Sequence, residues 1–188
     1  MSGDDDPRAW IPLLVSGKSG EIAEERFERV LHEYGPAWSR LASGYERDKA
    51  AREELVQEIA LAVWQALPHF RGECSERTFI YRIAHNRGLT HAYQRESVHS
   101  VLDELPAALE PVDPRPSPEE EVAMARQRDS LGAAVQRLPL AYRETVMLML
   151  EDLSHAEIAE ILGISESNVA VRLNRARKAL KDALGDRQ

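Results

Sequence analysis

Apolar residues recur at intervals of three and four along most of this chain, and no strict alternation typical of a half-buried strand appears. The longest such stripe runs from about position 48 to position 67 and includes Ile59, Val63 and Leu67. Residues at these intervals share one face of a helix and can pack against a core. The opposite face is mostly polar and carries Glu54, Gln57, Glu58, Leu61 and Gln65. The pattern predicts an all-helical protein.

Shorter stripes predict helices on either side of this one. They cover residues 21–34, 37–43, 76–94, 119–137 and 140–151. Gly35 and Pro36 separate the first two, because glycine and proline are the strongest local breaks in a helical pattern. Pro68 ends the long helix, and residues 69–75 are expected to form a loop before the next one.

A change of composition in the middle of the chain predicts a linker. The segment that begins at Val98 is rich in acidic residues and contains Pro106, Pro111, Pro114, Pro116 and Pro118. This density of proline and charge disfavours regular structure. We therefore expect two small helical domains, over residues 21–97 and 125–185, joined by a flexible acidic linker over 98–124. Residues 1–20 form an N-terminal tail.

Residues 154–180 have the pattern of a helix-turn-helix. Ser154 and Glu157 are spaced as a capping box for a first helix, Gly163 permits the left-handed turn that ends it, and Ser165 can cap a second. The outer face of that second helix is cationic in an otherwise acidic chain. Such a helix suits the major groove of DNA, with its N-terminal residues at the base edges. A helical hairpin whose charges are only solvated is the simpler alternative.

The distribution of charge supports a nucleic-acid partner better than the total does. The formal net charge of -8 is unusual for a protein that binds DNA. Arginines outnumber acids between Arg71 and Arg95, however, whereas acids dominate between His99 and Glu121. A polyanion such as DNA responds to the charge of the surface that it contacts rather than to the net charge of the whole protein. The basic segments are therefore candidates for DNA contact.

Other classes of function find little support in the sequence. A single cysteine, Cys74, excludes an internal disulfide and a multi-cysteine metal site. The six histidines form no His-Glu-x-x-His pair and no nucleophile triad, so we expect no enzyme, catalytic residues, metal or cofactor. No apolar run reaches membrane-spanning length, and the acidic start differs from a signal peptide. A cytoplasmic protein without membrane insertion is expected.

Three segments in this order resemble the sigma factors of the extracytoplasmic-function (ECF) group, also called group 4, which are promoter-recognition subunits of bacterial RNA polymerase. Residues 54–64 are similar to the family's helix that docks on the polymerase clamp. Phe70-Arg-Gly-Glu and residues 77–86 are similar to the segment that opens and reads the -10 element. Leu138-Pro139 followed by residues 156–180 is similar to the domain that reads the -35 element.

The resemblance assigns roles to named residues within sigma region 2 (residues 21–97) and sigma region 4 (residues 125–185). It implies -10 contacts by Arg71, Arg77, Tyr81, Arg82, Asn86, Arg87 and Arg95. It implies -35 contacts by Ser165, Glu166, Ser167, Asn168, Ala170, Val171, Arg172, Asn174, Arg175 and Lys178. The polymerase-docking face would consist of Glu54, Gln57, Glu58, Leu61 and Gln65.

Several of these assignments leave alternatives open. Asn86 would line a pocket for a flipped base, while Tyr81 fits a core position equally well. Arg82 would contact phosphate rather than a base. Ala170 and Val171 stand where the family often has a basic residue and a serine, so they would contact a thymine methyl group instead of base polar atoms. The polar face of residues 54–65 is by default only a solvated helix surface.

The resemblance also implies partners. These are core RNA polymerase, through its clamp helices and flap; promoter DNA; and an anti-sigma factor. The acidic linker would pass through the polymerase active-site cleft and RNA exit path as an RNA mimic, or serve only as a solvated tether. A free-standing helix-turn-helix repressor or activator is the alternative function. It predicts a dimer that binds duplex DNA tightly without polymerase.

Overall fold

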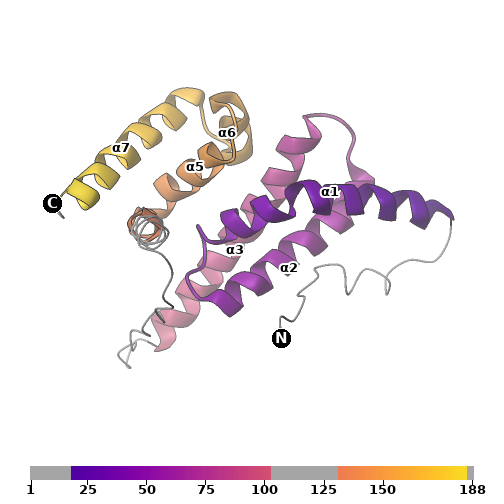
Figure 1. Cartoon of the computed structure of the whole chain (residues 1–188), viewed down its shortest axis with the longest axis horizontal. Helices are drawn as coiled ribbons and strands as arrows, with labels where there is room; N and C mark the ends of the chain where they lie inside the picture. The colour runs from indigo at the N-terminus through magenta and orange to yellow at the C-terminus, as the bar shows by residue number, and fades with distance from the viewer. Residues whose placement is uncertain (1–17, 103–130, 186–188) are drawn as a thin grey trace, which may run out of the picture. The chain divides into compact units, whose positions relative to one another are not determined.

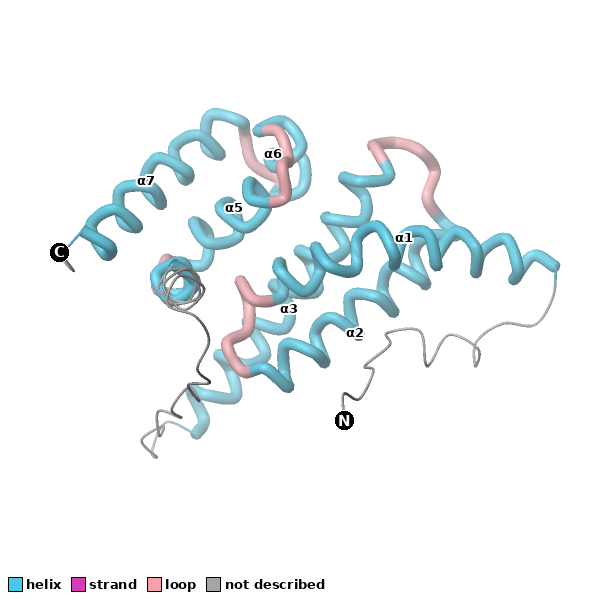
Figure 2. The backbone as a smooth tube through the Cα atoms, in the orientation of Figure 1, coloured by secondary structure: helices cyan, strands magenta, loops and turns pink. Residues whose placement is uncertain are grey.

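In the computed structural model, which describes residues 18–102 and 131–185, every regular element is a helix (Figures 1 and 2). The chain divides into two compact units, Met1–Gly88 and Leu89–Gln188. The first unit contains α1 (Lys18–Ala42), α2 (Lys49–Ala66), the 3-10 helix η2 (Leu67–His69) and the start of α3 (Glu76–Leu102). The second contains helical residues 131–136, α5 (Leu140–Leu150), α6 (His155–Leu162) and α7 (Glu166–Gly185). The all-helical expectation is confirmed for these residues.

Helix α1 is continuous, although Gly35 and Pro36 predicted a break within it. The prediction of two helices was wrong because the buried stripe continues on both sides of the proline, from Tyr34 to Trp38 and Leu41. A proline inside a helix costs about 3 kcal/mol. Full burial of each large apolar side chain recovers about 1.5–3 kcal/mol, so packing against the core outweighs the local break.

Helices α1 and α2 pack side by side in the first unit (Figure 1). The N-terminus of α2 is capped by Asp48, whose carboxylate accepts a hydrogen bond from the Ala51 amide at 2.8 Å. The predicted core stripe of this helix is confirmed, because Ile59, Val63 and Leu67 are buried. The acidic cap and the apolar stripe therefore define the start and the orientation of α2.

Helix α3 packs on the first unit through its own buried side chains. Ile80 is fully buried, and the ring of buried His85 is hydrogen-bonded to the Tyr45 hydroxyl, with 2.7 Å between Nδ1 and Oη. Gly88 lies beneath the Tyr45 ring, where a Cβ atom would come within 2.7 Å of the ring carbon Cγ. Only glycine permits this close approach of α3 to the loop between α1 and α2 (Figure 2).

Helix α3 is longer than the predicted 76–94, and it includes residues 98–102 of the predicted linker. The sequence contains no proline in this stretch before Pro106, so no local signal ends the helix earlier. The expectation of irregular structure was therefore wrong at positions 98–102. The rest of the predicted linker, over 103–124, lies outside the described residues, as do residues 1–17 of the predicted tail over 1–20. Residues 18–20 of that tail belong to α1 instead.

The second unit contains the predicted helix-turn-helix. Ser154 Oγ accepts a hydrogen bond from the Glu157 amide at 3.2 Å, while a Glu157 carboxylate oxygen accepts one from the Ser154 amide at 2.8 Å. Gly163 ends α6 in the left-handed region, with φ 65° and ψ 34°. Helix α7 packs on α5 and α6 through the fully buried Val169 and Ala176 (Figure 1). The capping box and the glycine turn are thus confirmed as predicted.

Candidate nucleic-acid interface

Helix α7 presents a polar and cationic surface on the side away from Val169. The helix starts at Ser165, whose Oγ accepts a hydrogen bond from the Asn168 amide at 3.3 Å and whose carbonyl accepts one from Val169 at 3.0 Å. The exposed members of the predicted -35 set are Ser165, Glu166, Ser167, Asn168, Val171, Asn174, Arg175 and Lys178. Ala170 is half-buried. Hydroxyl, amide and guanidinium groups on one surface suit both base edges and phosphates.

Arg172 differs from its neighbours because its guanidinium contacts other protein groups. Its Nη1 donates to Glu144 Oε1 at 2.9 Å and to the Ala141 carbonyl at 3.3 Å, and its Nε donates to Asn168 Oδ1 at 3.2 Å. The side chains of Arg172 and Glu144 are only 20% and 10% exposed. Burial raises the pKa of Glu144, although the attraction and hydrogen bond of Arg172 act in the opposite direction. Arg172 thus fastens α7 to α5.

A second contact between the same helices orients Arg175. Its Nη1 donates to the hydroxyl of Tyr142 at 3.3 Å, and the rest of this exposed arginine is accessible. Sequence reasoning missed both α5 partners, Glu144 and Tyr142. They lie 28 and 33 positions before the arginines that they contact, and no local pattern marks such a pairing.

The residues predicted to contact the -10 strand lie on α3 and on the loop before it. Arg71, Asn86, Arg87 and Arg95 are exposed, whereas Arg77 and Arg82 are half-buried. Sequence reasoning missed Tyr93, which is 59% exposed and lies two helical turns after Asn86 on the same side of α3. Exposed aromatic rings can stack on unpaired bases. The sequence signal that could have identified Tyr93 is an aromatic residue within this arginine-rich segment.

Tyr81 occupies a core position. Its side chain is 3% exposed, and its ring meets Tyr34 edge to face with 6.0 Å between the ring centroids. The guanidinium carbon of Arg77 lies 5.9 Å from the centroid of the Tyr81 ring. Of the two alternatives for Tyr81, the structure thus favours the core position, and we do not include this residue in the proposed DNA surface.

The loop over 70–75 is anchored at its ends and exposed between them. The Phe70 ring packs on Phe79 with 4.8 Å between their centroids. At the other end Ser75 Oγ accepts a hydrogen bond from the Thr78 amide at 2.9 Å and so caps α3. Gly72 is exposed with φ 76°, a backbone conformation that favours glycine. This arrangement leaves the middle of the loop, including Arg71, accessible to a ligand.

The polar face predicted on α2 is solvent-accessible. Glu54, Gln57, Glu58, Leu61 and Gln65 are all exposed, and Leu61 is the one large apolar side chain among them, at 41%. An isolated apolar residue within a polar surface is common on soluble proteins. It is also compatible with an exchangeable protein interface, which combines a few apolar anchors with a polar surround.

Neither a membrane span nor a metal site is found in the described part of the chain. None of its helices is long and apolar enough to cross a bilayer. Its histidine, cysteine and acidic side chains form no group of three or more that could hold a metal ion.

Comparison with known protein families identifies both units. Residues 30–97 match the family model for sigma-70 region 2, and residues 128–180 match the model for sigma-70 region 4. The sigma factor NccH of Alcaligenes xylosoxydans xylosoxydans is 30% identical over 86% of this chain and 88% of its own length. The ECF sigma factor SigE of Mycolicibacterium smegmatis is 26% identical over 96% of this chain and 69% of its own.

Two further comparisons concern length and fold. The chain spans only 41% of the length of a probable sigma factor, RfaY, of Xanthomonas campestris, with 25% identity over 86% of this chain. The fold is similar to that of the sigma factor RpoE from Bartonella quintana, solved with the anti-sigma factor NepR, with a TM-score of 0.68, 21% identity and coverage of 87% of this chain and 99% of the other. The chain therefore belongs to the sigma-70 family of RNA polymerase sigma factors, the subunits that direct transcription initiation.

Proposed function

We propose that this chain is an ECF-group sigma factor that brings core RNA polymerase to promoters with a -10 and a -35 element. The observation that carries this proposal is the helix-turn-helix of residues 154–180, whose second helix exposes polar and cationic side chains from its first turn onward. The match of residues 30–97 to region 2 supports a second contact, with an unpaired strand. The protein acts by recruitment, with no catalytic step of its own.

The -35 element is bound by α7 in the major groove. Ser167, Asn168 and Val171 are exposed in the first half of the helix, where a recognition helix contacts bases. The exposed methyl groups of Val171 suit contact with thymine, and Arg175 and Lys178 suit phosphates or a guanine edge. Arg172 contributes to this surface by holding α7 on α5.

The -10 element is bound as a single strand along α3 and the loop over 70–75. Asn86 faces a flipped base, and the exposed Arg71, Arg87 and Arg95 neutralise the strand's phosphates. Tyr93 provides a further stacking surface on the same side of α3 as Asn86. Residues 21–97 and 125–185 are the two functional modules, and residues 98–124 connect them in the polymerase.

The partners follow from the same assignment. The exposed α2 face around Leu61 docks on the clamp helices of polymerase, and the second module contacts the flap. The Bartonella sigma factor was solved with an anti-sigma factor, and we propose an inhibitory partner of that kind here. The acidic linker occupies the RNA exit path, and the protein works in the cytoplasm without entering the membrane.

In vitro run-off transcription tests this function. The full-length protein is added to sigma-free core polymerase over a pool of genomic promoter fragments. Discrete new transcripts are expected, and their start sites would reveal the two promoter elements. No transcripts, together with tight binding of duplex DNA by the protein alone, would contradict the proposal and support a free-standing repressor or activator.

Two single substitutions separate the two DNA contacts. Asn86→Ala should reduce open-complex yield and leave the closed complex intact, because Asn86 would contact the unpaired -10 strand and not duplex DNA. Arg175→Ala should weaken the holoenzyme footprint over the -35 element, because an exposed cation is removed from α7. Permanganate reactivity measures opening, and DNase footprinting measures the closed complex. Unchanged opening with Asn86→Ala would remove Asn86 from the -10 pocket, and an unchanged footprint would remove Arg175.

A further inference from the structure

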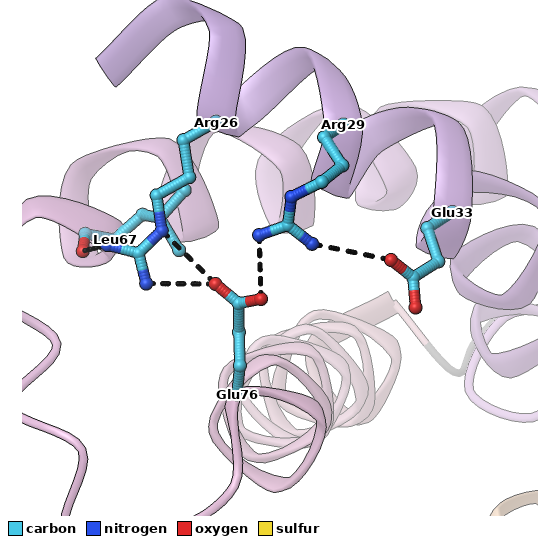
Figure 3. Close-up of polar contacts among 5 residues, drawn as sticks. All are labelled: Arg26, Arg29, Glu33, Leu67 and Glu76. Carbon is cyan, nitrogen blue, oxygen red and sulfur yellow. Dashed lines mark hydrogen bonds and ion pairs between the residues drawn. The ribbon is translucent and has the colours of Figure 1, made fainter. Parts of the chain in front are cut away.

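An ionic cluster ties α1 to the first residue of α3 (Figure 3). Arg26 donates from Nε and Nη2 to Glu76 Oε1, at 3.1 and 2.8 Å, and Arg29 donates from Nη2 to Glu76 Oε2 at 2.7 Å. Each carboxylate oxygen is therefore held by a different arginine. Burial raises the pKa of Glu76, but the hydrogen bonds from both arginines outweigh this and hold it below its usual value.

Arg26 also contacts the opposite end of the loop that precedes α3. Its guanidinium carbon lies 5.6 Å from the centroid of the Phe70 ring. Its Nη1 donates a hydrogen bond to the Leu67 carbonyl oxygen at 3.5 Å, which Figure 3 shows. Phe70 is the first residue of the loop, and Glu76 directly follows its last. One side chain from α1 therefore contacts both ends of the 70–75 loop, while Arg71, Gly72 and Glu73 between them are exposed.

We propose that Arg26 and Glu76 are positioning residues for promoter opening, because they fix both ends of the 70–75 loop and hold its exposed middle in one arrangement for the unpaired -10 strand. This inference rests on the function proposed above, in which that loop contacts the captured strand. A loop with fixed ends loses less conformational entropy when it binds than a loop with a loose end. The two residues need not touch DNA themselves.

The test is the affinity of holoenzyme for a fluorescent single-stranded oligonucleotide with the non-template -10 sequence that run-off transcription identifies. Holoenzyme is assembled from core polymerase and full-length protein. Arg26→Ala should weaken binding about 5- to 10-fold, the effect of losing one charge-assisted contact that orders a binding loop. Arg26→Lys should restore only part of the affinity, because a single ammonium group cannot pair with Glu76 through two nitrogens as the guanidinium does.

The matched control is Lys49→Ala. This change also removes one cation, but the Lys49 side chain is 82% exposed and pairs with Glu53 at 3.7 Å on α2, without a contact to either end of the loop. It should leave oligonucleotide binding unchanged. Assembly with core polymerase and binding of a -35 duplex should be normal in both variants. Amide hydrogen exchange should become faster in the 70–75 peptide of Arg26→Ala and stay unchanged in that of Lys49→Ala.

Three outcomes would contradict the inference. If wild-type holoenzyme binds the oligonucleotide and Arg26→Ala holoenzyme binds it equally well, the positioning role would be refuted. The proposed function would not be affected. A wild-type holoenzyme that neither binds the oligonucleotide nor starts transcripts would overturn the proposed function as well. If Arg26→Ala fails to fold, Glu76→Gln serves in its place, because it keeps the side-chain volume and turns an amide donor toward an arginine. Normal binding by that variant would again refute the positioning role.

Discussion

Arg172→Ala is expected to destabilise the second unit, although the residue lies in the predicted recognition helix. The change removes hydrogen bonds to Glu144 at 2.9 Å, to the Ala141 carbonyl at 3.3 Å and to Asn168 at 3.2 Å. Breaking a buried ion pair by deleting one partner costs about 3–5 kcal/mol. The Arg172 side chain is 20% exposed, so water can reach the site in the variant and solvate part of the unpaired carboxylate, which reduces the cost. We expect the free energy of unfolding to fall by about 2–3 kcal/mol.

The loss should depend on pH because of Glu144. Burial already raises the pKa of this carboxyl group in the wild type. Removal of Arg172 deletes its charge attraction and its hydrogen bond, both of which lower that pKa. The pKa of Glu144 in the folded state should therefore rise further in the variant. A carboxyl group whose pKa is raised by folding reduces stability as the pH increases through that folded pKa. The difference between variant and wild type should thus grow as the pH increases from the ordinary carboxyl range of about 4 toward neutral.

Urea unfolding of the full-length protein measures this difference, with circular dichroism for helix content. Trp10, Trp38 and Trp64 all precede the second unit. Tryptophan fluorescence therefore reports unfolding of the first unit and serves as an internal control. Arg175→Ala is the matched control. This exposed neighbour donates one hydrogen bond of 3.3 Å, so its loss should cost about 0.5 kcal/mol or less. A similarly small effect of Arg172→Ala, or one that is equal at acidic and neutral pH, would refute the reasoning.

Two glycine substitutions test close packing and backbone conformation. Gly88→Ala should cost about 1–3 kcal/mol, because its Cβ would lie 2.7 Å from Tyr45 Cγ and displace the ring that is hydrogen-bonded to His85. Fluorescence-detected urea unfolding should register that loss, and a stabilised variant would contradict the observed contact. Gly163→Ala should cost about 1 kcal/mol from its φ of 65° alone, since no atom lies near the new Cβ. Gly163→Asn should cost less, and equal stability of all three proteins by circular dichroism would argue against the left-handed turn.

The sequence predicted those parts of the fold that local chemistry controls. The helix-turn-helix depends on Ser154, Glu157 and Gly163, all within ten positions, and each acts as its residue type suggests. The break at Pro36 failed as a prediction because burial of Trp38 and Leu41 in the tertiary core decides the outcome, and a local proline signal does not register that burial. Charge patterns located the basic surfaces but could not separate arginines that face solvent from Arg172, whose acidic partner is on another helix.

The geometry of α7 explains why the proposed recognition surface is narrower than the predicted set. At about 100° per residue, six exposed members of the predicted set lie within an arc of about 120° around the helix. This arc contains Ser167, Asn168, Val171, Asn174, Arg175 and Lys178. Arg172 lies between the arc and the buried side that contains Val169 and Ala176, so its guanidinium reaches α5. In the proposed function, stability and base recognition therefore use different sides of α7, and substitutions within the arc should alter DNA binding while leaving the fold of the second unit intact.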